Sequence, residues 1–391
     1  MSTLRFTRLE LKNWKNFLDA QVDLSRRVFI VGPNAIGKSN FLDAFRFLRE
    51  LVIEGGGLGK AIADRKGMTK VRSLFARQRP AIALAATVED EDKNGWRYEL
   101  TFTHYSLKDP RPIILQERVF RLANGHETKV LDRPNDSDKS DPEQLTQTAL
   151  QQVTANQPFR ELAEFLRGIA YLHLVPQLLR EEQSFLSNGL SADPFGRDLL
   201  QRMRHTTPRQ QQTRLRRIEE VMKAVVPELK ELQLQIDDNG QPHLQGKFQH
   251  WRPQGALQDE TQFSDGTLRL IGLLWSLQEK SGPLLLEEPE LSLHTAIVRR
   301  LAPFIYRAQK AGNGRQVLLS THSEMLLQDI GVAPEEVLLV TPAPKGEGSR
   351  IVVGASIKNV VKLMQAGVPA SEAILPRTET RQMSLLDRLS A

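Results

Sequence analysis

Cysteine is absent from the 391 residues of the sequence, and this absence excludes several kinds of chemistry. Without thiols the chain can form no disulfide bond, no thiolate metal site and no cysteine nucleophile. Such a composition fits a reducing compartment, and we expect a cytoplasmic protein. Long apolar runs are also missing, so the sequence predicts no membrane span. The charged first residues lack the apolar centre of a signal peptide.

The composition that remains favours a folded chain. Hydrophobic residues make up 40% and charged residues 26%, which argues for a packed core and against general disorder. The length fits one large domain with insertions or two average domains. The formal net charge of +6 permits a polyanionic partner but does not demonstrate one.

Four short apolar runs have the composition of strands that are covered on both faces. They are rich in Val, Ile and Leu and do not alternate with polar residues. The runs are Val28–Val31, Leu284–Leu286, Val317–Leu319 and Val337–Val340. They predict an α/β fold with a mainly parallel core sheet.

The other segments predict insertions within a single domain. We assign the core to residues 1–55 and 255–355, including an N-terminal strand. Residues 80–135 alternate between strand patterns and turn residues, which predicts an antiparallel β layer. Residues 142–232 are expected to form a helical lobe, followed by a possible hairpin over 231–250, and residues 134–142 a polar loop. Residues 356–391 form a C-terminal extension.

Residues 32–39, GPNAIGKS, match the phosphate-binding pattern G-x-x-x-x-G-K-[ST] between a predicted strand and a predicted helix. Glycine lets the backbone approach an anion closely, and the N–H groups of residues 34–39 can converge on phosphates at a helix N-terminus. Lys38 would contact the β- and γ-phosphates, and Ser39 would bind Mg²⁺. The predicted ATP-binding residues are Gly32, Asn34, Ala35, Ile36, Gly37, Lys38, Ser39 and Asn40.

Two further apolar runs end in polar residues that suit ATP hydrolysis. The segment PLLLEEPELSLH at 283–294 places Glu287 where a carboxylate can bind Mg²⁺ and Glu288 where a general base can polarise water. The segment VLLSTHS at 317–323 ends at His322, which could contact the γ-phosphate or the attacking water. Glu288 and His322 are the predicted catalytic residues.

The segment FSDGTLRL at 263–270 has a Ser-x-Gly turn that opens a helix, a second anion-binding device. An ordinary helix cap at Ser264 would explain the same pattern. Its place about twenty residues before the acidic strand favours the functional interpretation. Ser264 and Gly266 are therefore the residues of a second predicted anion-binding turn.

Taken in order, these motifs resemble the ABC-type ATPase heads, and most closely their RecF, SMC and OLD-like branch. NWKNF at 13–17, SDGTLR, EEPELSLH and STHS are similar to motifs of the small RecF-like predicted ATPases, P-loop proteins of the AAA type. The resemblance implies head-to-tail dimers in which Ser264 and Gly266 of one subunit face ATP held by the other. It also implies that Lys15 contacts nucleotide, and it makes Gln177 a candidate for the Mg²⁺-sensing glutamine. It disfavours a P-loop kinase.

Departures from the family pattern predict slow turnover. Asp265 replaces a glycine of the transporter signature, and the proline that usually follows the histidine of the loop after the acidic strand is replaced by Thr295. The Mg²⁺-binding acid is Glu287 instead of aspartate.

The target of such an ATPase stays open at the sequence level. Seven arginines lie between residues 197 and 217 with few acids, which could follow a DNA backbone or could form a solvated helix face. One hypothesis is an ATPase acting on DNA in repair, maintenance or phage defence. The alternative is an ATP-gated scaffold or sensor that holds and releases a separate nuclease or toxin, with hydrolysis as a timer. We expect no nuclease domain within this chain.

Overall fold

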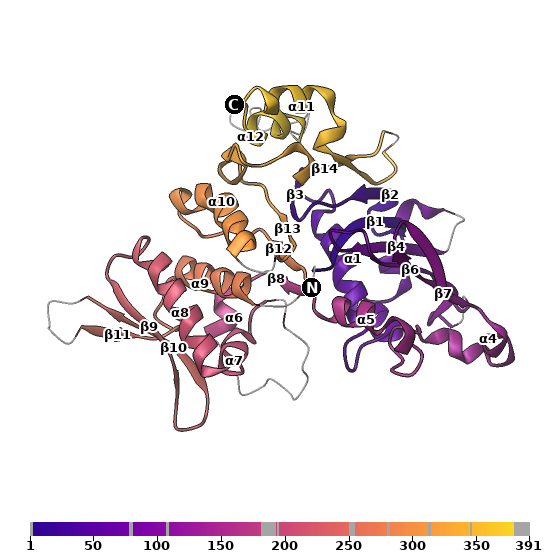
Figure 1. The fold of residues 1–391 in the computed structure, drawn as a ribbon, viewed down its shortest axis with the longest axis horizontal. Coiled ribbons are helices and arrows are strands. Elements are labelled where there is room, and N and C mark those ends of the chain that lie inside the picture. The colour runs from indigo at the N-terminus through magenta and orange to yellow at the C-terminus, as the bar shows by residue number, and fades with distance from the viewer. Residues whose placement is uncertain are drawn as a thin grey trace, which may run out of the picture.

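The computed structural model describes residues 3–77, 81–106, 109–180, 193, 195–249, 255–279, 282–311, 314–344 and 346–378. Three sheets organise these residues (Figure 1). A six-stranded, mainly parallel sheet lies between an antiparallel six-stranded sheet and a lobe of helices with a three-stranded sheet. In the described part of the chain, no helix is both long enough and apolar enough to cross a membrane.

The mainly parallel sheet has the strand order β15-β14-β3-β13-β12-β8. Its strands are β3 (Arg27–Val31), β8 (Ala170–Leu172), β12 (Leu284–Glu287), β13 (Val317–Ser320), β14 (Val337–Pro342) and the antiparallel edge strand β15 (Ser349–Val353). Alternate side chains enter two different cores, with Val28 and Ile30 on one face and Phe29 and Val31 on the other. Coverage of both faces explains the uninterrupted apolar runs and confirms the predicted fold class.

The antiparallel sheet has the order β2-β1-β4-β5-β6-β7. Its strands are β1 (Arg5–Trp14), β2 (Phe17–Asp23), β4 (Ile82–Glu89), β5 (Gly95–His104), β6 (Pro112–Ala123) and β7 (His126–Arg133). Helix α1 (Lys38–Glu50) packs on it through Phe41 and Phe45, whose rings meet Phe17 and Phe6 edge to face. Strands β1 and β2 therefore belong to the antiparallel sheet, whereas β3 of the same N-terminal segment belongs to the parallel one.

The helical lobe contains α6 (Pro176–Arg180), α7 (Leu199–Arg204), α8 (Pro208–Lys223) and α9 (Asp265–Gln278), next to α10 (Thr295–Ala311). Strands β9 (Leu229–Ile236) and β10 (Pro242–Phe248) form an antiparallel hairpin, and β11 (Ala256–Gln258) pairs with β10. Helices α11 (Lys358–Gln365) and α12 (Ala370–Ile374) follow β15.

Two segments differ from the sequence-based expectation. The predicted helical stretch is interrupted by β8, which pairs in parallel with β12 and so belongs to the core sheet. The predicted loop over 134–142 contains helix α4 (Asp136–Ser140), because Asn135 and Asp138 form a reciprocal capping box. Helices α2 (Leu58–Asp64), α3 (Met68–Val71) and α5 (Arg160–Arg167) complete the elements near the antiparallel sheet.

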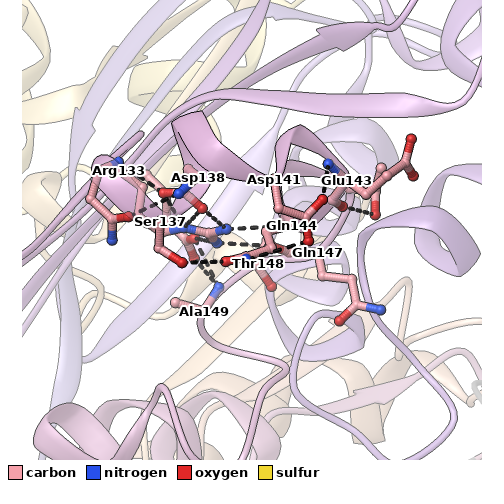
Figure 2. A network of polar contacts seen from close by, with 12 residues as sticks. Arg133, Ser137, Asp138, Asp141, Glu143, Gln144, Gln147, Thr148 and Ala149 are labelled. Carbon is pink, nitrogen blue, oxygen red and sulfur yellow. Dashed lines mark hydrogen bonds and ion pairs between the residues drawn. The ribbon is translucent and has the colours of Figure 1, made fainter.

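A buried charged network fixes α4 and the segment after it to the antiparallel sheet (Figure 2). Arg133, at the end of β7, donates to Asp138 at 2.7 Å and to Glu117 of β6 at 2.9 Å. The amide N–H of Ala149 also donates to Glu117, at 2.8 Å. Glu117 is fully buried and Arg133 is 5% exposed. One guanidinium therefore satisfies two buried carboxylates, and loss of either side leaves charge without compensation.

Replacing Arg133 with methionine should destabilise the fold strongly. The variant keeps much of the side-chain volume but leaves Glu117 and Asp138 buried without their cation, which costs about 3–5 kcal/mol. Urea unfolding measures the effect. Arg118→Met is the control, because Arg118 forms more exposed pairs with Asp132 and Glu99, whose loss costs under about 1 kcal/mol. Equal midpoints for the two variants would contradict the assignment.

Candidate active site

The P-loop connects the carboxyl end of β3 to the first turn of α1 (Figure 1). Gly37 has a φ of 109°, a left-handed conformation that L side chains rarely adopt, and it precedes the first residue of α1. A Cβ at Gly32 would lie 2.4 Å from the carbonyl oxygen of Val340. Both motif glycines are thus required by backbone geometry, and the loop is closed by Ser349, whose hydroxyl donates to the Ile36 carbonyl at 2.6 Å.

Lys38 is directed back into its own loop. Its Nζ donates to the carbonyl oxygens of Gly32 and Pro33, both at 3.0 Å, and the residue is only 6% exposed. Burial lowers the pKa of Lys38, although the nearby carboxylates of Glu288 and Glu287 act in the opposite direction. The ammonium group is therefore held by the loop that would surround the phosphates.

The two predicted Mg²⁺ ligands, Ser39 and Glu287, are hydrogen-bonded to each other. Glu287 ends β12, and its carboxylate accepts hydrogen bonds from the Ser39 hydroxyl at Oε1 and from the Tyr171 hydroxyl at Oε2. A serine hydroxyl beside a carboxylate supplies oxygen ligands of the kind that Mg²⁺ takes in phosphate-binding sites, where phosphates and water complete the shell. Among the described residues there is no cluster of three or more acidic or histidine side chains that could hold a metal alone.

Tyr171 is a site residue that the sequence motifs did not reveal. It lies on β8, which pairs with β12 so that Tyr171 is opposite Leu285. Burial and then the charge of Glu287 raise the pKa of the Tyr171 phenol well above its usual range, so the hydroxyl stays protonated and donates. Its only sequence signal was the short apolar run around it, which we interpreted as helical.

Glu288 and His322 lie together beyond the ends of β12 and β13. Glu288 Oε1 is 3.4 Å from His322 Nε2, and both side chains are about one-third exposed. Glu288 has a φ of 44°, and its N–H donates to Ser320 at 3.1 Å. Burial, followed by the charge of Lys38, lowers the pKa of His322 against the opposing effect of Glu288. A neutral imidazole near a carboxylate suits the positioning of water or phosphate.

Glu290 is a second residue to which the sequence gave no role. Its carboxylate accepts from the Thr321 hydroxyl at 2.5 Å and from the backbone N–H of His322 at 3.2 Å. Burial raises its pKa despite these bonds. Glu290 thus fixes the loop after β12 to the end of β13, and thereby sets the position of His322.

The signature segment is held within its own subunit by two residues of α6. Ser264 caps α9 and accepts from the Thr267 N–H at 3.2 Å. Asp265 accepts from Gln177 at 2.8 Å and pairs with Arg180 at 2.7 Å. A Cβ at Gly266 would lie 2.6 Å from the carbonyl of Ser292, so glycine is needed there. The structure therefore places Gln177 against the signature, whereas Tyr171 is the residue beside Glu287.

Lys15 and Asn40 are directed toward residues around α1. Lys15 Nζ pairs with Asp43 at 2.5 Å, and Asn40 donates to the side chain of Asn16. Burial alone would raise the pKa of Asp43, but its hydrogen bond to Arg65 and the charges of Arg65 and Lys15 outweigh burial and lower it to about 2. Lys15 is thus paired with α1 in the structure, and its contact with nucleotide stays a prediction.

The fold and the P-loop together define a P-loop ATPase domain whose fold is similar to that of SMC heads. The fold is similar to a solved SMC head bound to the C-winged helix domain of ScpA, with a TM-score of 0.53 and 16% identity over 89% of this chain and 96% of that one. It is also similar to an SMC head from Pyrococcus furiosus with an extended coiled coil, with a TM-score of 0.51 and 13% identity over 93% and 99%. These similarities concern the fold alone.

A family model described as "AAA domain, putative AbiEii toxin, Type IV TA system" matches residues 27–328. The chain belongs to this family, and its resemblance to the RecF, SMC and OLD-like ATPases is confirmed. A 58-residue segment is 38% identical to Endonuclease GajA of Bacillus cereus (strain VD045). That segment covers 15% of this chain and 10% of the endonuclease.

Replacing Tyr171 with phenylalanine tests whether its hydroxyl positions Glu287. The variant keeps the ring but removes the donor, so Glu287 should orient less well toward Ser39, and the Mg²⁺ concentration for half-maximal ATP turnover should rise roughly tenfold, the loss of about one charged hydrogen bond. Tyr306→Phe is the control, because Tyr306 is 45% exposed on α10. An unchanged Mg²⁺ dependence in the Tyr171 variant would refute the role.

Proposed function

We propose that this protein binds and hydrolyses ATP with Mg²⁺ and that nucleotide controls its association into head-to-tail dimers. The observation that carries the proposal is the hydrogen bond between Ser39 and Glu287. It joins the first turn after the P-loop to the acidic strand, at the place where a phosphate-bound Mg²⁺ requires both oxygens.

The neighbouring residues supply the remaining chemical functions. Lys38 would exchange its loop carbonyls for phosphate oxygens, and the loop N–H groups would bind the same anion. Glu288 would accept a proton from the attacking water, with the neutral His322 orienting the γ-phosphate. Slow turnover follows from the same geometry, because Glu288 and His322 are partly exposed until a second subunit excludes water from them.

The dimer is supported by the separation of the signature from the P-loop contacts. Within the described residues, Ser264, Asp265 and Gly266 contact α9, α6 and the segment at Ser292, respectively. Ser264 is exposed at the N-terminus of α9, so this helix end is open to an anion held by a second subunit. Hydrolysis would then weaken the dimer by removing a group that both subunits contact.

We propose two alternative biological targets. The first is DNA, in repair, maintenance or phage defence, and the second is a separate effector protein that the ATP state holds and releases. DNA-stimulated ATP turnover favours the first. Co-purification with a protein that Glu288→Gln retains and the wild type releases on adding ATP favours the second.

Glu288→Gln should bind ATP with wild-type affinity, hydrolyse it about 100-fold or more slowly, and accumulate as a dimer. Glutamine keeps the shape of the side chain but cannot accept the proton. Phosphate release measures turnover, and light scattering with ATP measures the dimer. Glu54→Gln is the matched control, since Glu54 is exposed in the loop after α1. Normal turnover in the Glu288 variant would remove that residue from the mechanism.

Lys38→Ala should abolish ATP binding in a calorimetric titration, because the loop loses its one cation at the phosphates. Lys70→Ala, which alters an exposed lysine on α3, is the control. Retention of wild-type affinity in the Lys38 variant would contradict the assignment of the loop.

A further inference from the structure

A groove of 1190 Å³ lies at the edge of the parallel sheet opposite to the P-loop. Pro283 and Val317, which line it, are at the amino ends of β12 and β13, whereas Glu287 and His322 follow the carboxyl ends of these strands. Its walls are the helices α8, α9 and α10 together with the end of α5 and residues 3–4. Figure 1 shows the N-terminus between the helical lobe and α5, where these elements meet.

The groove carries a positive excess. Five arginines line it, against the two carboxylates of Glu164 and Glu279: Arg209, Arg214, Arg217, Arg307 and Arg315. Glu279 is already paired with Arg202 at 2.7 Å, outside the groove lining. Among the described residues, no ion pair involves Arg209, Arg217 or Arg307, and all three are exposed. Their charges are therefore available to an anion.

The cations come from separate parts of the chain. Arg209 and Arg217 lie on α8 two turns apart, and Arg307 lies on α10, across the groove. Other arginines of the 197–217 stretch are engaged elsewhere: Arg202 with Glu279, Arg204 with the Gly240 carbonyl, and Arg216 with Glu220. The basic stretch seen in the sequence is thus divided, and only part of it faces this groove.

Two aromatic rings also line the groove, although the basic stretch has almost none. Phe165 of α5 and Phe304 of α10 are half-buried, and Phe165 also packs edge to face on Phe6. Basic side chains next to exposed ring surface are the combination that binds phosphates and stacks unpaired bases. A duplex offers its phosphates but keeps its bases stacked inside, so it would use only half of this surface.

We propose that this groove binds single-stranded nucleic acid, with phosphates on Arg209, Arg217 and Arg307 and bases on Phe165 and Phe304. The proposal extends the first alternative above, in which the ATPase acts on DNA, and its biological role rests on that alternative. Binding itself does not require ATP hydrolysis. The opposite edge of the sheet, with Glu287, Glu288 and Glu290, repels a polyanion unless Mg²⁺ is present.

Fluorescence anisotropy with a labelled 15-nucleotide oligothymidylate tests the groove on the full chain. The double variant Arg217→Ala/Arg307→Ala should weaken binding at least tenfold at 0.1 M salt. It should also reduce the slope of log affinity against log salt by about 1.4, since each lost phosphate contact on a single strand removes about 0.7. Phe304→Leu, which keeps an apolar side chain, should weaken binding severalfold without changing the salt slope.

The control is Arg216→Ala/Arg300→Ala, which removes two exposed arginines from the same two helices but outside the groove lining. It should leave affinity within twofold of wild type. Equal loss in both double variants, or displacement of the oligonucleotide by poly-glutamate as readily as by unlabelled oligothymidylate, would overturn the proposal. A 15-base-pair duplex that competes better than the single strand would overturn it as well.

Wild-type ATP turnover without nucleic acid is measured in parallel. ATP turnover without oligonucleotide binding would contradict the groove proposal and leave the ATPase proposal intact. Oligonucleotide binding without turnover counts against the ATPase assignment and leaves the groove standing.

Discussion

The hydrogen bonds of the Glu287 carboxylate hold together the residues at the carboxyl edge of the parallel sheet, where the P-loop lies. This carboxylate accepts from Ser39 at the start of α1 and from Tyr171 on β8, so the last residue of β12 connects β8 to the helix that follows β3. Because these strands are parallel, their carboxyl ends reach the same edge, and residues far apart in sequence meet there. The P-loop, the acid pair and His322 are brought together by strand direction.

A second set of contacts fixes the loops beyond this edge. Glu290 joins the segment after β12 to Thr321 and His322, and Glu288 is held by the Ser320 carbonyl. Glu288 has a left-handed φ. This conformation is tolerated because β12, which precedes Glu288, and β13, to which it is hydrogen-bonded, are both anchored in the two cores. Strain at the residue proposed as general base is therefore supported by the packed sheet beneath it.

The sequence was most informative where a motif coincided with a buried strand. β3, β12, β13 and β14 were predictable because a strand covered on both faces must be apolar along its whole length. β8 was missed because three residues flanked by helices carry too little periodicity to separate strand from helix. The position of β1 and β2 was missed because pairing with β4 is a long-range choice that local patterns do not encode.

The same reasoning explains which candidate site residues the sequence could supply. Gly32, Lys38, Ser39, Glu287, Glu288 and His322 occur in patterns whose spacing is set by local backbone geometry. Tyr171 and Glu290 act through partners contributed by other strands or loops, so only the fold reveals them. Gln177 lay in a plausible segment, but α6 directs it to Asp265, since the segment leaves the sheet after β8 and turns toward α9.

Strand direction also separates the two charged edges of the sheet. Carboxylates lie where β12 and β13 end, and arginines lie near where these strands begin. Each strand has only four residues, so the two edges are close together. Helix α9 connects the edges as well, because its first residue is held by Gln177 and Arg180 while Leu274, Leu277 and Gln278 near its end line the arginine groove. In the proposed dimer, α9 would therefore join the contact with the second subunit at its first turn to the groove wall at its other end.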